Sequence, residues 1–128
     1  NLPLDVVKHM KKQKHPLKLI TGDLLSHYPY GKIFTIDNLE EEAEKFFQRD
    51  RVPTGLLSGK KVKKSVDLAY EIEKEYEANT GEDGARRFAW IFPEEVESNY
   101  KEDKNWMELK FYLPKGSYAT EVIAEIIH

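Results

Sequence analysis

The chain has 128 residues, 20 of them basic and 23 acidic, so its formal net charge is −3 and it lacks the positive excess typical of histone-like or polybasic proteins. It contains no cysteine, which excludes disulfides, zinc ribbons, iron–sulfur clusters and thiol catalysis and favours a reducing, cytoplasmic compartment. Its apolar runs are far shorter than the roughly 20 residues of a membrane-spanning helix, so no membrane partner is expected. The amino end shows no signal-peptide pattern and no initiating Met, so we expect that the reading frame begins upstream or that the chain was processed.

Hydrophobic periodicity predicts an α+β fold of short strands and helices, organised as one domain. In the first half of the chain, the expected elements are a helix over 4–13, a strand over 17–20, a turn over 21–23, a rigid aromatic loop over 27–31, a strand over 33–36 and a helix over 38–49. In the second half they are a loop over 52–59, a strand over 88–92, a polar linker over 101–105, a strand over 106–113 and a helix that Ser117 caps. Between the loop and the first of these strands, a helix that Ser65 caps is expected to carry Leu68, Ala69, Ile72 and Tyr76 along one face and to end at 79–81.

The helix over 38–49 carries the clearest local signals. Asp37 and Glu40 fit a capping box, in which each side chain bonds the other residue's backbone N–H. Leu39, Ala43, Phe46 and Phe47 recur at helical spacing and predict the buried stripe.

Two lysine clusters stand out in this acidic chain. One lies within residues 1–18, and the other consists of Lys60, Lys61, Lys63 and Lys64. Such clusters would attract a polyanion, because local potential rather than net charge governs encounter. The alternative is that both are simply solvated faces.

Two further patterns suggest phosphate binding. Arg86 and Arg87 enter an aromatic strand, and guanidinium groups grip phosphate bidentately; the alternative is a structural ion pair. Lys115, Gly116 and Ser117 offer a cation, backbone amides and a hydroxyl at a helix start; the alternative is a helix cap after a tight turn.

Patterns for catalysis and metal binding are weak. No phosphate loop, serine elbow or zinc-protease signature occurs, and the histidines are too dispersed for a metal site. Asp23 follows Gly22 and is read as a turn residue that bonds its own backbone rather than as a general base.

The segment from Met107 to Ile123 closely resembles the segment that closes the TruD family of tRNA pseudouridine synthases: a strand, then Leu-Pro-x-Gly-Ser-[Tyr/Phe]-Ala-[Thr/Ser], then a helix. The pattern Pro-Thr-Gly-x-Leu-x-Gly over 53–59, the pair Gly22-Asp23 and Gly84-x-Arg86-Arg87 support the resemblance, which spans about 17–128.

This resemblance implies a parent enzyme that isomerises a uridine in tRNA to pseudouridine, without metal or organic cofactor. The family's catalytic aspartate lies in a Gly-Leu-Lys-Asp context that is absent here, as is its Asn-Tyr-Phe-Gly-x-Gln-Arg-Phe-Gly segment, so the chain is expected to be a carboxyl-terminal part that is inactive alone. Residues 1–103 would belong to the family's inserted module, and 104–128 would supply a strand and helix to the catalytic sheet. That strand would then pair with the remainder of the catalytic domain or with a second copy of the chain.

By the same resemblance, tRNA is the expected partner, and the site residues take two roles. The expected RNA contacts are Arg86, Arg87, Lys60, Lys61, Lys115, Gly116 and Ser117, and the expected walls of the uridine pocket are Phe111 and Tyr118. The alternative from another class is a stand-alone, non-catalytic RNA-binding or protein-interaction module.

Overall fold

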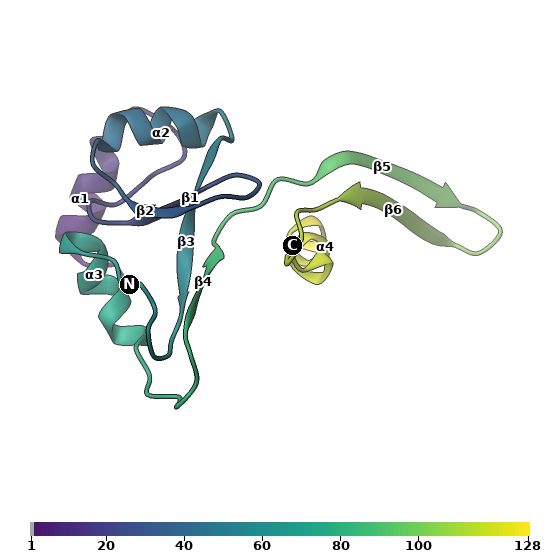
Figure 1. Cartoon of the computed structure of the whole chain (residues 1–128). Coiled ribbons are helices and arrows are strands. Elements are labelled where there is room, and N and C mark those ends of the chain that lie inside the picture. The colour runs from purple at the N-terminus through teal and green to yellow at the C-terminus, as the bar shows by residue number, and fades with distance from the viewer. Residues whose placement is uncertain (1) are drawn as a thin grey trace. The chain divides into compact units, whose positions relative to one another are not determined.

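The computed structural model describes residues 2–128, which form two compact units, one ending at Trp90 and one beginning at Ile91 (Figure 1). The first unit contains a four-stranded sheet with three α-helices, and the second contains a two-stranded sheet with one α-helix. This confirms the predicted α+β class. No helix in residues 2–128 is both long enough and apolar enough to cross a bilayer.

The elements of the first unit are α1 (Leu4–Lys11), β1 (Leu24–His27), β2 (Ile33–Thr35), α2 (Leu39–Phe47), β3 (Arg51–Leu57), α3 (Asp67–Glu73), the 3₁₀ turn η1 (Lys74–Tyr76) and β4 (Ala85–Phe88). The elements of the second unit are β5 (Glu94–Lys101), β6 (Trp106–Tyr112) and α4 (Ala119–Ile127).

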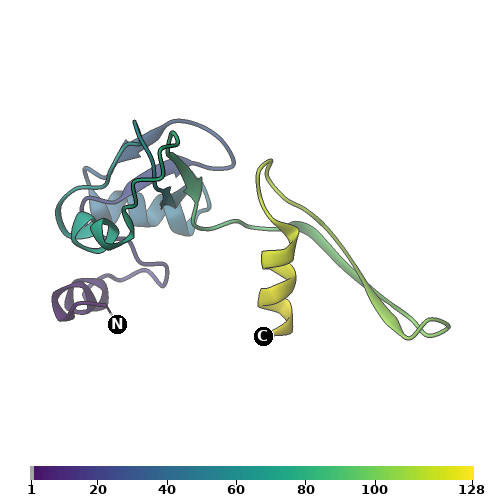
Figure 2. The ribbon, with the colours of Figure 1, turned by 90° about the horizontal axis from the view of Figure 1, so that it is seen from below.

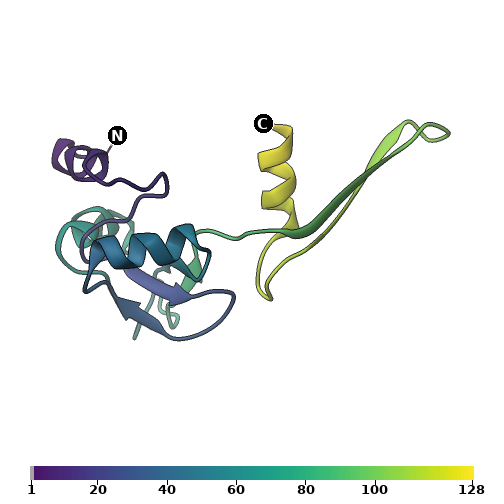
Figure 3. The same ribbon diagram turned by 90° about the horizontal axis from the view of Figure 1, so that it is seen from above.

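The sheet of the first unit has the strand order β2-β1-β3-β4, and every neighbouring pair is antiparallel. Successive residues of β3 point to opposite faces. Arg51 reaches Glu42 of α2 at 3.3 Å, whereas Arg86, which lies opposite Leu56, reaches Glu73 of α3. Accordingly, α2 and α3 lie on opposite sides of the sheet, as Figures 2 and 3 show from below and from above.

The core of the first unit is small and apolar. Phe46 of α2 is fully buried and its ring meets that of Trp90 edge-on at 5.8 Å between centroids. The other buried apolar side chains are Val6, Leu19, Leu24, Leu25, Ala43, Val52 and Ala69.

Two strand predictions, over 17–20 and over 88–92, and the loop prediction over 52–59 are wrong. The strand β4 ends at Phe88, so residues 89–92 lie outside any strand. Residues 17–20 form no ladder, because the Gln13 side chain accepts from the Leu19 N–H at 3.0 Å and donates to its carbonyl. The predicted loop 52–59 is instead mostly the central strand β3. Pro53 has no N–H to donate, and it is tolerated in β3 because it lies beyond the end of β4, where the ladder requires no donor from it. Its carbonyl accepts from the Ala89 N–H at 2.9 Å.

Helix α1 begins at Leu4 as predicted, whereas the caps of the other three α-helices differ from those predicted. Asn38, not Asp37, caps α2 by accepting from the Glu41 N–H at 3.2 Å. Ser65 does not cap α3, which begins at Asp67, and no side chain caps α4, whose N-cap position is held by Tyr118 rather than Ser117.

In the second unit, β5 and β6 form an antiparallel hairpin whose turn is the predicted polar linker 101–105. The strand over 106–113 is confirmed as β6. The strand β5 was not predicted, because polar residues interrupt its few apolar ones. In Figure 1 the tip of the hairpin projects away from α4. Within residues 91–128 the one buried apolar residue is Val122, at 9% exposure.

Several large apolar side chains of this unit are uncovered. Directly opposed residues share a face, so Tyr100 lies beside Met107, and both are more than half exposed. On α4, Ile126 and Ile127 are 54% and 72% exposed. A two-stranded hairpin is marginal in water by itself, so this unit has more apolar surface than it can bury within its own 38 residues.

Candidate functional site

The most buried polar cluster of the first unit centres on Arg86. Its side chain is 2% exposed, and its Nη1 donates to Glu73 Oε1 at 2.5 Å. Its Nε and Nη2 donate to Thr54 Oγ1 and Thr54 O at 3.1 and 3.0 Å. The guanidinium is therefore occupied by protein groups on β3 and α3. Of the two alternatives left open by the sequence, this geometry fits the structural ion pair and not a contact with an RNA phosphate.

Glu73 is held equally firmly on its other oxygen. The backbone N–H and the hydroxyl of Ser65 both donate to Glu73 Oε2, at 2.8 and 2.7 Å. Burial raises the pKa of Glu73, but the hydrogen bonds from Ser65 and Arg86 outweigh this effect and leave the pKa below its usual range. Glu73 thus joins α3, as a carboxylate at neutral pH, to the lysine-bearing segment 60–64 before it.

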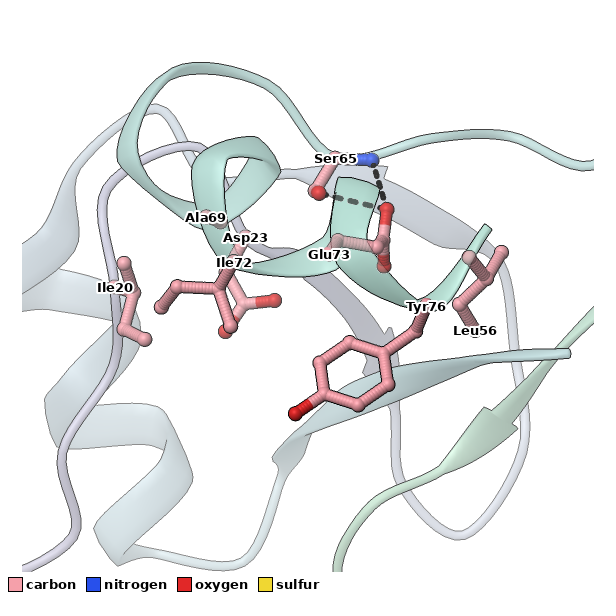
Figure 4. A pocket seen from close by; sticks show the side chains of 8 residues that line it. All are labelled: Ile20, Asp23, Leu56, Ser65, Ala69, Ile72, Glu73 and Tyr76. Atoms are coloured by element: carbon pink, nitrogen blue, oxygen red, sulfur yellow. Dashed lines mark hydrogen bonds between the residues drawn. The ribbon is translucent and has the colours of Figure 1, made fainter. Parts of the chain in front are cut away.

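A cavity of about 290 Å³ lies beside this cluster (Figure 4). Its polar lining comes from Asp23, Ser65 and Glu73. Its remaining lining is apolar or aromatic: Ile20, Leu56, Ala69, Ile72 and Tyr76. Tyr76 was predicted to lie on one face of a helix that continues beyond it, but α3 ends at Glu73 and Tyr76, on η1, is 71% exposed at the rim.

Asp23 sits at the start of β1 and faces this cavity. Its Oδ1 accepts from the Leu24 N–H at 2.9 Å, as expected of a turn residue. Burial raises the pKa of Asp23 to about 6, although the hydrogen bond from Leu24 and the charge of Arg86 oppose the rise. The carboxyl is therefore mostly ionised at pH 7 but protonates in mild acid.

This shift predicts a specific pH dependence of stability. The pKa of Asp23 rises on folding from 3.8 to about 6, so its contribution favours the folded state at low pH and is lost as the pH rises through about 6. Asparagine mimics the neutral carboxyl, so Asp23→Asn should gain stability relative to the wild type between pH 4 and pH 7. Urea denaturation of both proteins across this range measures the difference, and a flat difference would contradict the assignment.

The other predicted site residues of the first unit are solvent-facing. Arg87 lies on β4 opposite Gly55 and is exposed, in contrast to its neighbour Arg86. Lys60 and Lys61 are exposed in the segment between β3 and α3, where the Lys60 backbone pairs with Glu82 and Gly84. The Lys61 ammonium lies 3.4 Å from Asp83 with both side chains largely in water, a pair of little energetic weight.

The segment over 60–64, called the lysine loop below, is anchored to the cluster formed by Arg86, Glu73 and Thr54. Arg86 Nη1 also approaches the carbonyl of Lys63 at 3.4 Å, and Lys64 pairs with Glu77 at 2.6 Å. Because both ends of the segment are fixed, the ammonium groups of Lys60, Lys61 and Lys63 are presented on a defined loop.

The remaining predicted site residues belong to the second unit. The Ser117 N–H donates to the Pro114 carbonyl at 3.1 Å, which closes a turn through Lys115 and Gly116. Gly116 has φ +88°, and a Cβ built on it would meet nothing within 4 Å. Phe111 is half-buried on β6, and Tyr118 is 54% exposed at the start of α4.

Sequence reasoning missed Glu73, Ser65 and Tyr76 as members of the site. Glu73 reads as one more carboxylate on an acidic helix, and Ser65 reads as a helix cap. No sequence pattern points to these residues. Their role follows from the contacts of Glu73 with the buried Arg86 and with Ser65, which only the tertiary structure shows. Within residues 2–128 no group of three or more His, Asp or Glu is placed to hold a metal ion.

Comparison with known proteins shows which family this chain resembles along its length. A family model described as tRNA pseudouridine synthase D (TruD) matches residues 6–126. The tRNA pseudouridine synthase D of Sulfurimonas denitrificans is 49% identical over 126 residues, and that of Wolinella succinogenes is 48% identical over 128 residues. The same protein of Helicobacter pylori strain HPAG1 is 47% identical over 135 residues.

The chain therefore belongs to the TruD family, as the resemblance of its closing segment predicted. The matches cover 98%, 99% and 100% of this chain, but only 35%, 36% and 35% of the respective relatives. The chain thus spans about a third of the length of the curated relatives it matches.

Proposed function

We propose that this chain acts as part of a tRNA pseudouridine synthase that isomerises a uridine in tRNA to pseudouridine. The observation that carries the proposal is the 49% identity to a tRNA pseudouridine synthase D over 98% of the chain. The reaction breaks the bond between base and sugar, turns the base and rejoins it through carbon. It requires no cofactor, and with tRNA as substrate we place it in the cytoplasm.

In this proposal the chain contributes RNA contacts and not the nucleophile. Lys60, Lys61 and Arg87 would meet phosphates, since all three residues are exposed. The open surroundings of Gly116 would let an RNA backbone approach the turn that holds Lys115 and Ser117. Phe111 and Tyr118 would wall the uridine pocket, and the catalytic aspartate would lie in a part of the protein outside this chain.

The uncovered apolar side chains of the second unit support assembly with more protein. Tyr100, Met107 and Ile126 are each more than half exposed, which favours a partner over a stand-alone module. We propose that this partner is the remainder of the catalytic domain. Because β5 pairs with β6, the structure favours moving the boundary between inserted module and catalytic elements from residue 103 to residue 90.

The activity is tested with the native gene product purified from its source cell. Incubation with an unmodified tRNA transcript should yield pseudouridine. Because uridine and pseudouridine have the same mass, the RNA is treated with a reagent that labels pseudouridine but not uridine and is then digested and analysed by mass spectrometry. The 128-residue chain should yield none under the same conditions. A native product that binds the transcript but forms no pseudouridine would contradict the enzyme assignment and favour the non-catalytic RNA-binding module.

Contacts between lysines and phosphates predict a change in salt dependence. Each lost contact lowers the slope of log K against log salt by roughly 0.7–0.9. Replacing Lys60 and Lys61 together by alanine should therefore weaken tRNA binding and flatten the slope by about 1.5. Filter binding at several salt concentrations measures it.

The matched control removes the same charge elsewhere. Lys45 is bonded to Glu41 and Glu42, and Lys74 is bonded to Glu71, so both ammonium groups are already paired. The double substitution Lys45→Ala with Lys74→Ala should leave the slope unchanged. An equal effect of the two double variants would show that only overall charge, and not this loop, governs binding.

A further inference from the structure

The cavity of the first unit contains a carboxylate oxygen that is still able to accept hydrogen bonds. Asp23 Oδ1 accepts from the Leu24 N–H, whereas in the described part of the chain Oδ2 has no hydrogen-bond partner. Glu73, the other carboxylate of the lining, is fully committed to Ser65 and Arg86. Asp23 is therefore the acceptor that a ligand in this cavity would meet.

The surroundings of Asp23 suit a flat ring. Ile20, Leu56 and Ile72 line the space beside the carboxylate, and the Tyr76 ring stands at its edge, as Figure 4 shows. With a volume of about 290 Å³, the cavity lies at the small end of the range for ligand sites, roughly 300–1,000 Å³, and suits one ring system. Aromatic side chains at such edges are platforms on which unpaired nucleobases stack.

We infer that this cavity binds a guanine base of the RNA, with Asp23 accepting from its N1–H and N2–H₂ groups and Tyr76 stacking on its ring. The inference rests on the proposed function, which supplies RNA as the ligand. Guanine is the base whose Watson–Crick edge carries two adjacent donors. These match Asp23 Oδ2 and the second lone pair of Asp23 Oδ1, whose first lone pair accepts from the Leu24 N–H.

The other bases fit this acceptor poorly. Adenine and cytosine each place a ring-nitrogen acceptor beside their single amine, and that acceptor would face the carboxylate. Uracil flanks its one N–H with two carbonyls, which a carboxylate repels. The cavity is thus distinct in chemistry from a pocket for the uridine that is isomerised, and it would read a base elsewhere in the substrate.

The test uses the 128-residue chain with isotope-labelled backbone amides, titrated with guanosine 5′-monophosphate and, separately, uridine 5′-monophosphate. Both nucleotides carry the same phosphate, so a difference between them reports the base. We expect saturable shifts of the amides of Gly22, Asp23 and Ser65 with the guanine nucleotide, and an affinity at least about tenfold weaker for the uracil nucleotide.

Two pairs of variants locate the contacts. Asp23→Asn keeps the oxygen that accepts from Leu24 and should weaken guanine-nucleotide binding by about tenfold or more; its amide spectrum verifies that it folds. Tyr76→Phe should bind like the wild type, whereas Tyr76→Ala should bind more weakly. Tyr30→Ala, which removes an 83% exposed ring elsewhere, should change nothing.

Three results would overturn the inference: equal affinity for the two nucleotides, shifts confined to Lys60–Lys64, or unchanged binding by Asp23→Asn. Binding of a tRNA transcript to the same wild-type preparation separates this failure from that of the proposed function. Transcript binding without guanine selectivity would overturn only the guanine site. Failure of the transcript itself to bind would count against the proposed RNA-contacting role.

Discussion

Replacing Arg86 by alanine is expected to lower the free energy of unfolding of the first unit by about 3–5 kcal/mol. The substitution leaves the Glu73 carboxylate, whose side chain is 11% exposed, without its cation. It also removes the bonds by which Arg86 ties Thr54 of β3 to α3. Urea denaturation followed by circular dichroism measures the loss.

The neighbouring arginine provides the control. Arg87 is exposed on the same strand, so Arg87→Ala removes the same charge and nearly the same sequence context at a solvated position. We expect it to change stability by well under about 1 kcal/mol and to weaken tRNA binding instead. If the two variants lost stability equally, the structural assignment of Arg86 would be wrong.

The second large effect is expected at Gly22, which precedes Asp23. Gly22 has φ +85°, and a Cβ there would lie 2.0 Å from the Val66 carbonyl oxygen at the start of α3. Gly22→Ala combines left-handed strain of about 1–2 kcal/mol with an overpacking cost of about 1–3 kcal/mol, so a loss of roughly 2–5 kcal/mol is expected. Thermal or urea denaturation measures it.

Gly81 separates the two contributions. Its φ of +76° is similar, but a Cβ there would meet nothing within 4 Å. Gly81→Ala should therefore show the backbone strain alone, about 1–2 kcal/mol. A loss at Gly22 no larger than that at Gly81 would mean that the close approach of α3 to the Gly22–Asp23 turn does not constrain the fold.

Elements defined by local patterns were predictable from the sequence. The helices over 4–11, 39–47 and 119–127 and the strand over 106–112 follow apolar periodicities that need no knowledge of the rest of the chain. The strand β3 could not be predicted in this way, because Pro53 and Gly55 are residues typical of a loop. Its pairing with β1 and β4 is decided by residues far away in the sequence.

The candidate site illustrates the same limit. The lysine loop and the closing Leu-Pro-Lys-Gly-Ser segment are visible as sequence patterns, so their candidate roles could be written down in advance. The role of Arg86 depends on Glu73, 13 residues away, and on Thr54, 32 residues away. No spacing rule connects these positions, and only the packing of α3 on the sheet distinguishes Arg86 from Arg87.

The central proposal is that this chain is part of a longer enzyme. The most direct test is the intact mass of the native gene product in its source cell, detected with an antibody raised against this chain. We predict a product roughly three times heavier than the 15.0 kDa of the chain, because the chain spans 35% of a relative that is 49% identical to it. A native product of 15.0 kDa would contradict the claim and remove the enzyme assignment for this polypeptide.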